Sequence, residues 1–417
     1  MLHAYRDTAP LVALVVLLVV AYVHPRGRVE AFAGVGGAVL ALSTGALGVA
    51  AARTELTDLL PVVVFLLAIL VVAEACRAEG LFSAVGARLA LRGDPHSLLL
   101  LAATVAALVT VALSLDATVV LLTPVVIAAA AAVRAPSRPA ELACVRMANS
   151  ASLLLPVSNL TNLLALSHLS LSFGAFLLRM APSWVAVVAI EYGAVRWMFR
   201  ADLGRRTRVP ATVPDVLPPL PRVPLLAISL MLCSFGFTSA FGVRPVWSAV
   251  LAALVLGGYT VNRRRATAVQ LVRSAHFPFG VFVLGLGLVV AVLARTWLGT
   301  AVQDLLPAGH GFAALLGVAA LGGVLANLVN NLPAILLVVP MVAPLGATAV
   351  LALLVGINVG SSLTWTGSLA NLLWRRSLAR NGGSSTGRDF HRVSLLATPI
   401  AVVVGVAVLY AWAGVVG

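Results

Sequence analysis

The chain has 417 residues, of which 61% are hydrophobic and only 10% are charged. That little polar surface cannot cover a water-soluble globule, so the composition excludes a soluble enzyme or soluble binding domain as the main body. The net charge of +14 comes from 28 arginines and no lysine. Because these arginines lie in short loops between apolar runs, they indicate a cytoplasmic membrane surface and no nucleic-acid partner.

Apolar runs long enough to cross a bilayer as helices recur along the whole chain. Membrane helices are predicted at 10–23, 31–51, 58–75 and 174–199 in the first half, and at 223–241, 245–261, 277–294 and 392–416 in the second. The first run follows no basic segment and precedes no small-residue cleavage site, so we interpret it as a retained membrane helix. Segments 79–92 and 296–306 are predicted to be amphipathic surface helices.

Two further regions in each half are apolar but interrupted by polar residues. These regions are 97–133, broken around Ser114 to Asp116; 141–172, broken around Pro156 to Asn162; 311–345, broken at Asn327 to Pro333; and 347–376, broken at Ser361 to Ser368. Segments 149–162 and 358–371 have the same length and share an asparagine at both ends, together with a serine and two leucines. Their offset of 209 residues is about half the chain, which indicates an internal repeat.

The arginines also predict the topology. If 97–133 and 311–345 are re-entrant hairpins and 141–172 and 347–376 are broken crossings, the outer side holds only five of the 28 arginines: Arg6, Arg53, Arg179, Arg244 and Arg295. This asymmetry favours an outside N-terminus and two repeats of opposite orientation. The predicted fold is an all-α polytopic membrane protein with two inverted repeats, about 10 transmembrane helices and two re-entrant hairpins.

The same pattern sets the predicted domain organisation. Residues 1–199 form the first repeat, 200–222 a Pro- and Arg-rich cytoplasmic linker, and 223–417 the second repeat, with a flexible Gly/Ser loop at 377–391.

Four breaks that meet inside a membrane predict a binding site, because unpaired backbone groups are tolerated there only in a cavity or inside the protein. The expected substrate- or ion-binding residues are Asp116, Thr118, Ser158, Asn159, Asn162, Asn327, Asn330, Asn331, Thr364 and Ser368, with Thr161, Thr366 and Asn371 nearby. Uncharged groups suit a small neutral polyhydroxyl solute or a partly dehydrated ion. Asp116 lies in the middle of an apolar segment, where the charged form is costly, so we expect it to carry a proton as the coupling group or to cap the second hairpin helix.

Other polar residues receive structural interpretations. Glu74 with Arg77 and Glu191 with Arg196 are predicted to be interfacial ion pairs, and the three cysteines to be apolar core residues without a metal site or disulfide. Gly383 to Gly387 matches GxSxG but lies in a polar loop, and GxxxxGK[ST] and HExxH are absent. No catalytic residue, cofactor or metal is therefore expected, and the chain is interpreted as a transporter that is not an enzyme.

Several motifs carry a resemblance to a known family. Ala326 to Met341, with its Asn330-Asn-Leu-Pro333 core, the segment from Asp116 to Ile127, and Ser152 to Asn162, with Ser158-Asn-Leu160, resemble the arsenical pump membrane protein (arsenite/antimonite permease) family of the ion transporter superfamily. The resemblance covers roughly residues 60–415. The chain departs from the family at the first hairpin tip, where Leu115-Asp116-Ala117 stands in place of Asn-Asp-Gly.

The resemblance implies a multi-pass inner-membrane protein that exports arsenite or antimonite, coupled to inward proton movement or helped by a soluble ATPase subunit. It implies that Asp116 is the coupling acid and that Asn159, Asn162, Asn330, Asn331 and Ser368 shape the site. A permease for citrate, a dicarboxylate or another small anion, or a sodium/proton antiporter, is the alternative. The sequence leaves open the oligomeric state, a homodimer included, and whether an ATPase subunit binds.

Overall fold

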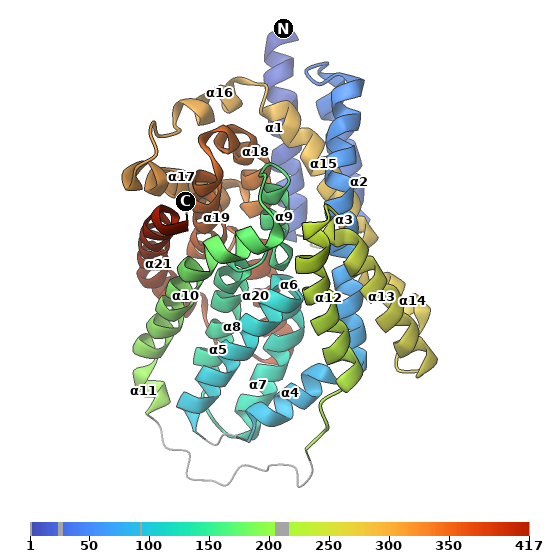
Figure 1. The fold of residues 1–417 in the computed structure, drawn as a ribbon, viewed down its shortest axis with the longest axis vertical. Helices are drawn as coiled ribbons and strands as arrows, with labels where there is room; N and C mark the ends of the chain where they lie inside the picture. Colours follow the sequence, from blue (N-terminus) through green and yellow to red (C-terminus); the bar gives the residue numbers. More distant parts are fainter. Residues whose placement is uncertain (1, 24–27, 92–93, 205–216, 417) are drawn as a thin grey trace.

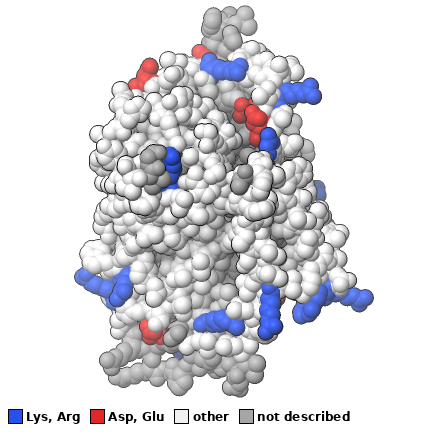
Figure 2. Space-filling view, in the orientation of Figure 1, with Lys and Arg blue, Asp and Glu red and all other residues white. Residues whose placement is uncertain are grey.

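The computed structural model describes residues 2–23, 28–91, 94–204 and 217–416, and throughout these ranges the regular secondary structure is helical (Figure 1). Nine helices of the described residues are long and apolar enough to cross a membrane. Charged side chains gather toward the two ends of the molecule, and the middle of the visible face is almost free of them (Figure 2). The expected all-α polytopic fold is confirmed.

The helices pack in two groups that each draw on both halves of the chain. One group, which we call the scaffold group, contains α1 (Leu2–Val23), α2 (Arg28–Ser43), α3 (Val49–Ala78), α12 (Arg222–Ala240), α13 (Pro245–Asn262), α14 (Ala268–Ser274) and α15 (Phe277–Leu293). These helices contact one another far more than they contact the rest of the chain.

The other group, the hairpin group, holds the interrupted segments. It contains α5 (Pro95–Ala112), α6 (Leu115–Ala117), a π-helical turn (Thr118–Leu122), α7 (Thr123–Ala132), α8 (Arg138–Ser150), α9 (Leu160–Leu166), α10 (Phe173–Met198), α17 (Phe312–Val329), α18 (Asn331–Val342), α19 (Ala347–Gly360), α20 (Leu369–Asn381) and α21 (Gly387–Val416). The short helices α4 (Leu81–Leu89), α11 (Arg200–Leu203) and α16 (Trp297–Asp304) connect them, and α4 and α16 lie where amphipathic helices were predicted.

The two halves run in opposite directions. Helices α5 to α7 lie in the lower half of Figure 1 and form a hairpin that returns to the end it came from, whereas α17 and α18 do the same in the upper half. Likewise α8 lies below α9, but α19 lies above α20 (Figure 1). The arrangement is that of inverted repeats with one re-entrant hairpin each.

Glycines let the helices of each group approach closely. A Cβ on Gly356 of α19 would overlap the carbonyl oxygen of Ala319 in α17, and a Cβ on Gly285 of α15 would overlap that of Gly34 in α2. Small residues at such crossings allow backbone-to-backbone contact, which replaces the hydrophobic driving force that is missing between helices in lipid. The tightest crossings therefore lie within the two groups.

One helix boundary and one loop boundary expected from the sequence need correction. The helix predicted at 31–51 is interrupted, because α2 ends at Ser43 and Gly45 takes a left-handed φ of 68° before α3 begins at Val49. The loop predicted at 377–391 is confined to 382–386, where Ser384 and Ser385 donate backbone N–H groups to the buried Glu141 carboxylate, at 3.0 and 2.8 Å. In the predicted 200–222 linker, α11 and the start of α12 are described, while 205–216 lie outside the described residues.

We expect Gly356→Ala to destabilise the protein by about 1–3 kcal/mol, because the added methyl group has only backbone to displace. Gly36→Ala is the matched control, since a Cβ there meets nothing within 4 Å. Thermal unfolding of the purified protein in detergent measures both. Equal unfolding temperatures would contradict the close α17–α19 packing.

Candidate substrate site between the hairpin tips

Each hairpin tip is closed by a polar side chain that caps the helix after it. The Ser114 hydroxyl accepts from the backbone N–H of Ala117 at 3.3 Å, and the Asn330 side-chain oxygen accepts from that of Leu332 at 3.4 Å. Asn330 has a φ of 74° and a ψ of 155°, a strained backbone conformation that residues other than glycine rarely adopt. The π-helical turn follows directly after the first tip, and such turns are frequent at functional sites.

The two broken crossings are joined by a reciprocal set of side-chain hydrogen bonds. Asn149 donates to the Asn371 side-chain oxygen at 2.8 Å, and Asn358 donates to that of Asn162 at 2.7 Å. In the same way, Ser368 donates to Asn149 at 2.9 Å, and its equivalent Asn159 donates to Asn358 at 3.1 Å. These four contacts form two pairs that are related by the 209-residue offset of the repeat.

Two asparagines also donate hydrogen bonds to backbone carbonyl oxygens at the breaks. The Asn162 side-chain NH₂ donates to the carbonyl oxygens of Ser152 and Leu155, at 2.7 and 2.9 Å. Its equivalent Asn371 donates to those of Ser361 and Thr364, at 3.0 and 2.9 Å. Both asparagines are fully buried, so they act as internal caps of the broken helices.

A fully buried ion pair supports the first break. The Arg146 guanidinium binds the Glu191 carboxylate through Nε and Nη2, at 2.6 and 2.5 Å, and its remaining N–H groups reach Thr398, Ser394 and the Ser362 carbonyl of the second break. All five guanidinium N–H groups therefore have acceptors. The predicted interfacial pair of Glu191 with Arg196 is wrong, because α10 turns Glu191 inward. The Glu74–Arg77 pair is confirmed, with Nε to Oε2 at 2.7 Å.

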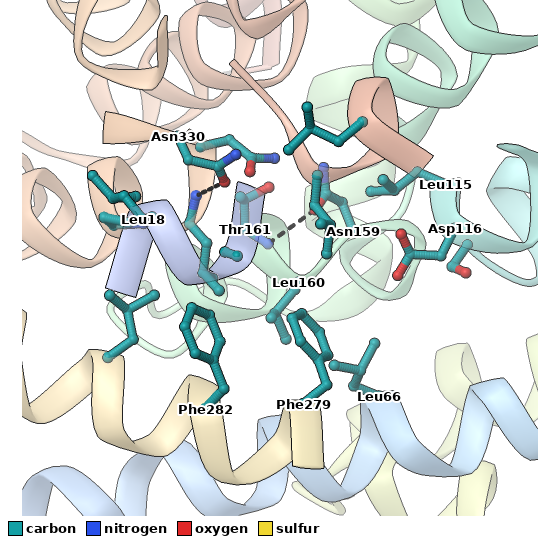
Figure 3. A pocket seen from close by; sticks show the side chains of 18 of the residues that line it. Leu18, Leu66, Leu115, Asp116, Asn159, Leu160, Thr161, Phe279, Phe282 and Asn330 are labelled. Carbon is teal, nitrogen blue, oxygen red and sulfur yellow. Dashed lines mark hydrogen bonds between the residues drawn. The ribbon is translucent and has the colours of Figure 1, made fainter. Parts of the chain in front are cut away.

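A cavity of about 310 Å³ separates the hairpin tips from the scaffold group. Its polar lining comes from both tips and from the adjacent breaks: Ser114, Asp116, Asn159, Thr161, Asn330, Asn331 and Thr366, with Tyr22 of α1. Asp116 and Asn330 lie on different sides of the space, and Phe279 and Phe282 of α15 form an apolar wall (Figure 3). Among the described residues, the lining contains no arginine, lysine or histidine. The cavity is therefore largely apolar, with neutral hydrogen-bonding groups and one carboxyl group, which is 7% exposed.

The structure divides the ten predicted site residues into two sets. Asp116, Asn159, Asn330 and Asn331 line the cavity. The others lie behind it and bond to protein groups: Thr118 to Thr110, Ser158 to the Val111 carbonyl, Asn162 to the first break, Asn327 to Thr364 and to the Gly360 carbonyl, and Ser368 to Asn149.

Sequence reasoning missed the scaffold wall of the cavity. Tyr22, Phe65, Phe279 and Phe282 lie in continuous membrane helices whose sequences carry no polar break, so nothing in their pattern distinguishes them from lipid-facing residues. Arg146 was also missed. It follows the four apolar residues 142–145 within a membrane segment, and an arginine in such a place is usually buried with a partner.

An all-helical bundle with apolar spans, two facing hairpin tips and a cavity between two helix groups defines a multi-pass membrane transporter. Residues 8–351 match the model of the citrate transporter family, and the chain belongs to this family.

Individual relatives refine this picture. The arsenical pump membrane protein of Escherichia coli is 27% identical over 93% of this chain and 94% of its own. That of Yersinia enterocolitica is 28% identical over 72% of this chain and 73% of its own. The resemblance to arsenical pump membrane proteins is thus confirmed. A solved structure, that of the Alcanivorax borkumensis YdaH transporter, has 17% identity and a TM-score of 0.44 over 87% of each chain, a level from which we infer nothing.

We expect Glu191→Gln to destabilise the protein by about 3–5 kcal/mol, because it leaves the Arg146 charge buried without a counter-charge. Glu74→Gln is the control, since its partner Arg77 is half exposed and the loss should stay below about 1 kcal/mol. Chemical or thermal unfolding in detergent measures both.

The double variant Arg146→Met/Glu191→Leu removes both charges and should regain a large part of the stability lost in Glu191→Gln. A double variant that is less stable than the single one would mean that the guanidinium acts mainly through Ser362, Ser394 and Thr398 and not through the ion pair.

Proposed function

We propose that this chain is a secondary active transporter of the plasma membrane that exports arsenite or antimonite in exchange for protons. The observation that carries the proposal is the chemistry of the cavity: its described lining offers hydroxyl and amide groups and one carboxyl group, and no cationic side chain. A small neutral hydroxylated solute can exchange its water for such groups. The names of the arsenical pump relatives agree with this substrate class.

The main alternative substrate, citrate or another carboxylate, fits the cavity less well. A multiply charged anion brought into a largely apolar space calls for arginine, lysine or oriented N–H groups to offset its desolvation. Here the carboxyl group in the cavity lining belongs to Asp116. When this carboxyl group is charged, it would repel an anion. This favours the neutral solute over the carboxylate.

The internal caps favour protons over sodium as the coupling ion. Carbonyl groups at broken helices commonly coordinate Na⁺, but here Asn162 and Asn371 donate to the carbonyl oxygens of Ser152, Leu155, Ser361 and Thr364. A sodium ion would have to displace these buried bonds. Asp116, which faces the cavity, is the group we assign to proton coupling.

Alternating access follows from the two helix groups. The proposal is that the hairpin group moves against the scaffold group as a body, because the tight glycine crossings lie within each group and the cavity lies between them. Asp116 moves with the hairpin tip, so it can take up a proton at the outer side and release it at the inner side, while the solute crosses on the opposite, outward movement.

Arsenite accumulation in everted membrane vesicles, with and without an imposed proton gradient, tests the proposal. Wild type should accumulate arsenite when the gradient is present, and Asp116→Asn should lose the gradient-dependent part because its side chain cannot release a proton. Asp94→Asn is the control: Asp94 caps α5 by accepting from the Ser97 N–H at 2.9 Å, lies outside the cavity, and asparagine serves equally well as a cap.

Uptake should be independent of sodium, because the carbonyl groups of Ser152, Leu155, Ser361 and Thr364 already accept from Asn162 and Asn371. Arsenite uptake driven by a sodium gradient would overturn the coupling assignment. Uptake of citrate, with none of arsenite under any gradient, would overturn the substrate.

A further inference from the structure

Two consecutive arginines of the hairpin group hold the C-terminal end of the first scaffold helix. Arg376 Nη2 donates to the carbonyl oxygens of Tyr22 and Val23, at 3.1 and 2.8 Å. These two residues are the last described residues of α1, and both carbonyl oxygens accept from the same guanidinium nitrogen. Arg375 Nη1 approaches the Tyr22 hydroxyl oxygen at 3.4 Å.

The contact lies at the edge of the cavity. Tyr22 and Leu372 are both lining residues, the first on α1 and the second on α20, one turn before Arg376. The two arginines thus bridge the two helix groups at a point where the groups are otherwise separated by the cavity. The bridge differs from the Arg146–Glu191 pair because Tyr22 and Arg375 are exposed, so solvent can replace their bonds.

One of these arginines, Arg375, also contacts the second break, next to the cavity-lining residue Thr366. The Cζ atom of Arg375 lies 5.3 Å from the centre of the Trp365 ring. Trp365 stacks on Phe390 of α21, with 4.6 Å between the two ring centres. Trp365 directly precedes Thr366, whose carbonyl oxygen accepts from Asn330 at 2.9 Å. The second hairpin tip, the second break and the end of α1 are therefore linked through one chain of contacts.

We propose that Arg375 and Arg376 form a latch that fastens α20 to the end of α1, closes the Tyr22 edge of the cavity, and releases when the hairpin group moves. The proposal rests on the proposed transport function for its role in the cycle. Its structural part, closure of the cavity edge, does not depend on which solute is carried. The latch sets how often the cavity opens at this edge, and so acts on the rate of exchange and not on solute recognition.

The test measures how fast a membrane-impermeant maleimide reaches a cysteine inside the cavity. The reporter is Leu18→Cys, on the turn of α1 before Tyr22, in a Cys233→Ser background, because Cys76 and Cys144 are buried. Labelling is followed in membrane vesicles of both orientations. Tyr22 itself stays intact, so the reporter leaves the arginine contacts in place.

Adding Arg375→Gln and Arg376→Gln should raise the labelling rate about fivefold, equivalent to about 1 kcal/mol of closed-state stability. The control is Arg380→Gln, one turn further along α20, which removes one positive charge from the same helix, and Arg376→Gln alone is the variant matched to it in charge. Gel filtration in detergent confirms that each variant is folded. A labelling rate equal to that of the Arg380 control would overturn the latch.

Arsenite uptake by the same variants separates the two proposals. A changed uptake rate together with faster labelling supports release of the latch within the cycle, whereas faster labelling with wild-type uptake removes the latch from the cycle. If wild type carries no arsenite, the proposed function fails, but the labelling result still decides whether the arginines close the cavity.

Discussion

The structure depends on how the backbone groups freed at the helix breaks are satisfied without water. Each break exposes carbonyl and N–H groups in a region of the chain that is apolar on both sides, and each unpaired group there costs several kcal/mol. The solution is an amide network in which each half supplies asparagines to the other. Because the partners lie in opposite halves, the network fixes both breaks in the same plane and brings the two hairpin tips to one cavity.

This solution separates the residues that hold the site from those that face it. Asn162, Asn371, Asn327 and the Arg146–Glu191 pair have their hydrogen-bonding groups used by the protein and are buried or partly buried. Asp116, Asn330 and Thr161 face the cavity. The supporting set is rigid because it is saturated, and that rigidity lets the hairpin group act as one body against a scaffold wall of leucine and phenylalanine side chains.

The sequence was sufficient to predict the all-helical membrane fold, the four breaks and the repeat, since each is a local interruption of an apolar run. It was not sufficient to say which polar residues line the cavity, because Asn159 and Asn162 stand three positions apart in one short segment, both bond to protein groups, and only Asn159 also lines the cavity. It also could not pair Arg146 with Glu191, which are 45 positions apart, when Arg196 stands nearer in the sequence. Partner choice across helices is set by packing, which the linear pattern does not contain.

The reciprocal hydrogen bonds are of the kind that two identical half-length chains in opposite orientations would form. A half-length ancestor inserted in both orientations would have made each asparagine contact twice, as a symmetric pair of separate molecules, so the network needs no covalent link between the halves. The Arg146 position breaks that symmetry: its counterpart, Val355, is apolar and equally buried. A separate half-length gene would have placed the guanidinium on both sides at once. In a single chain the two positions can differ, and here one half buries a charge where the other buries a valine.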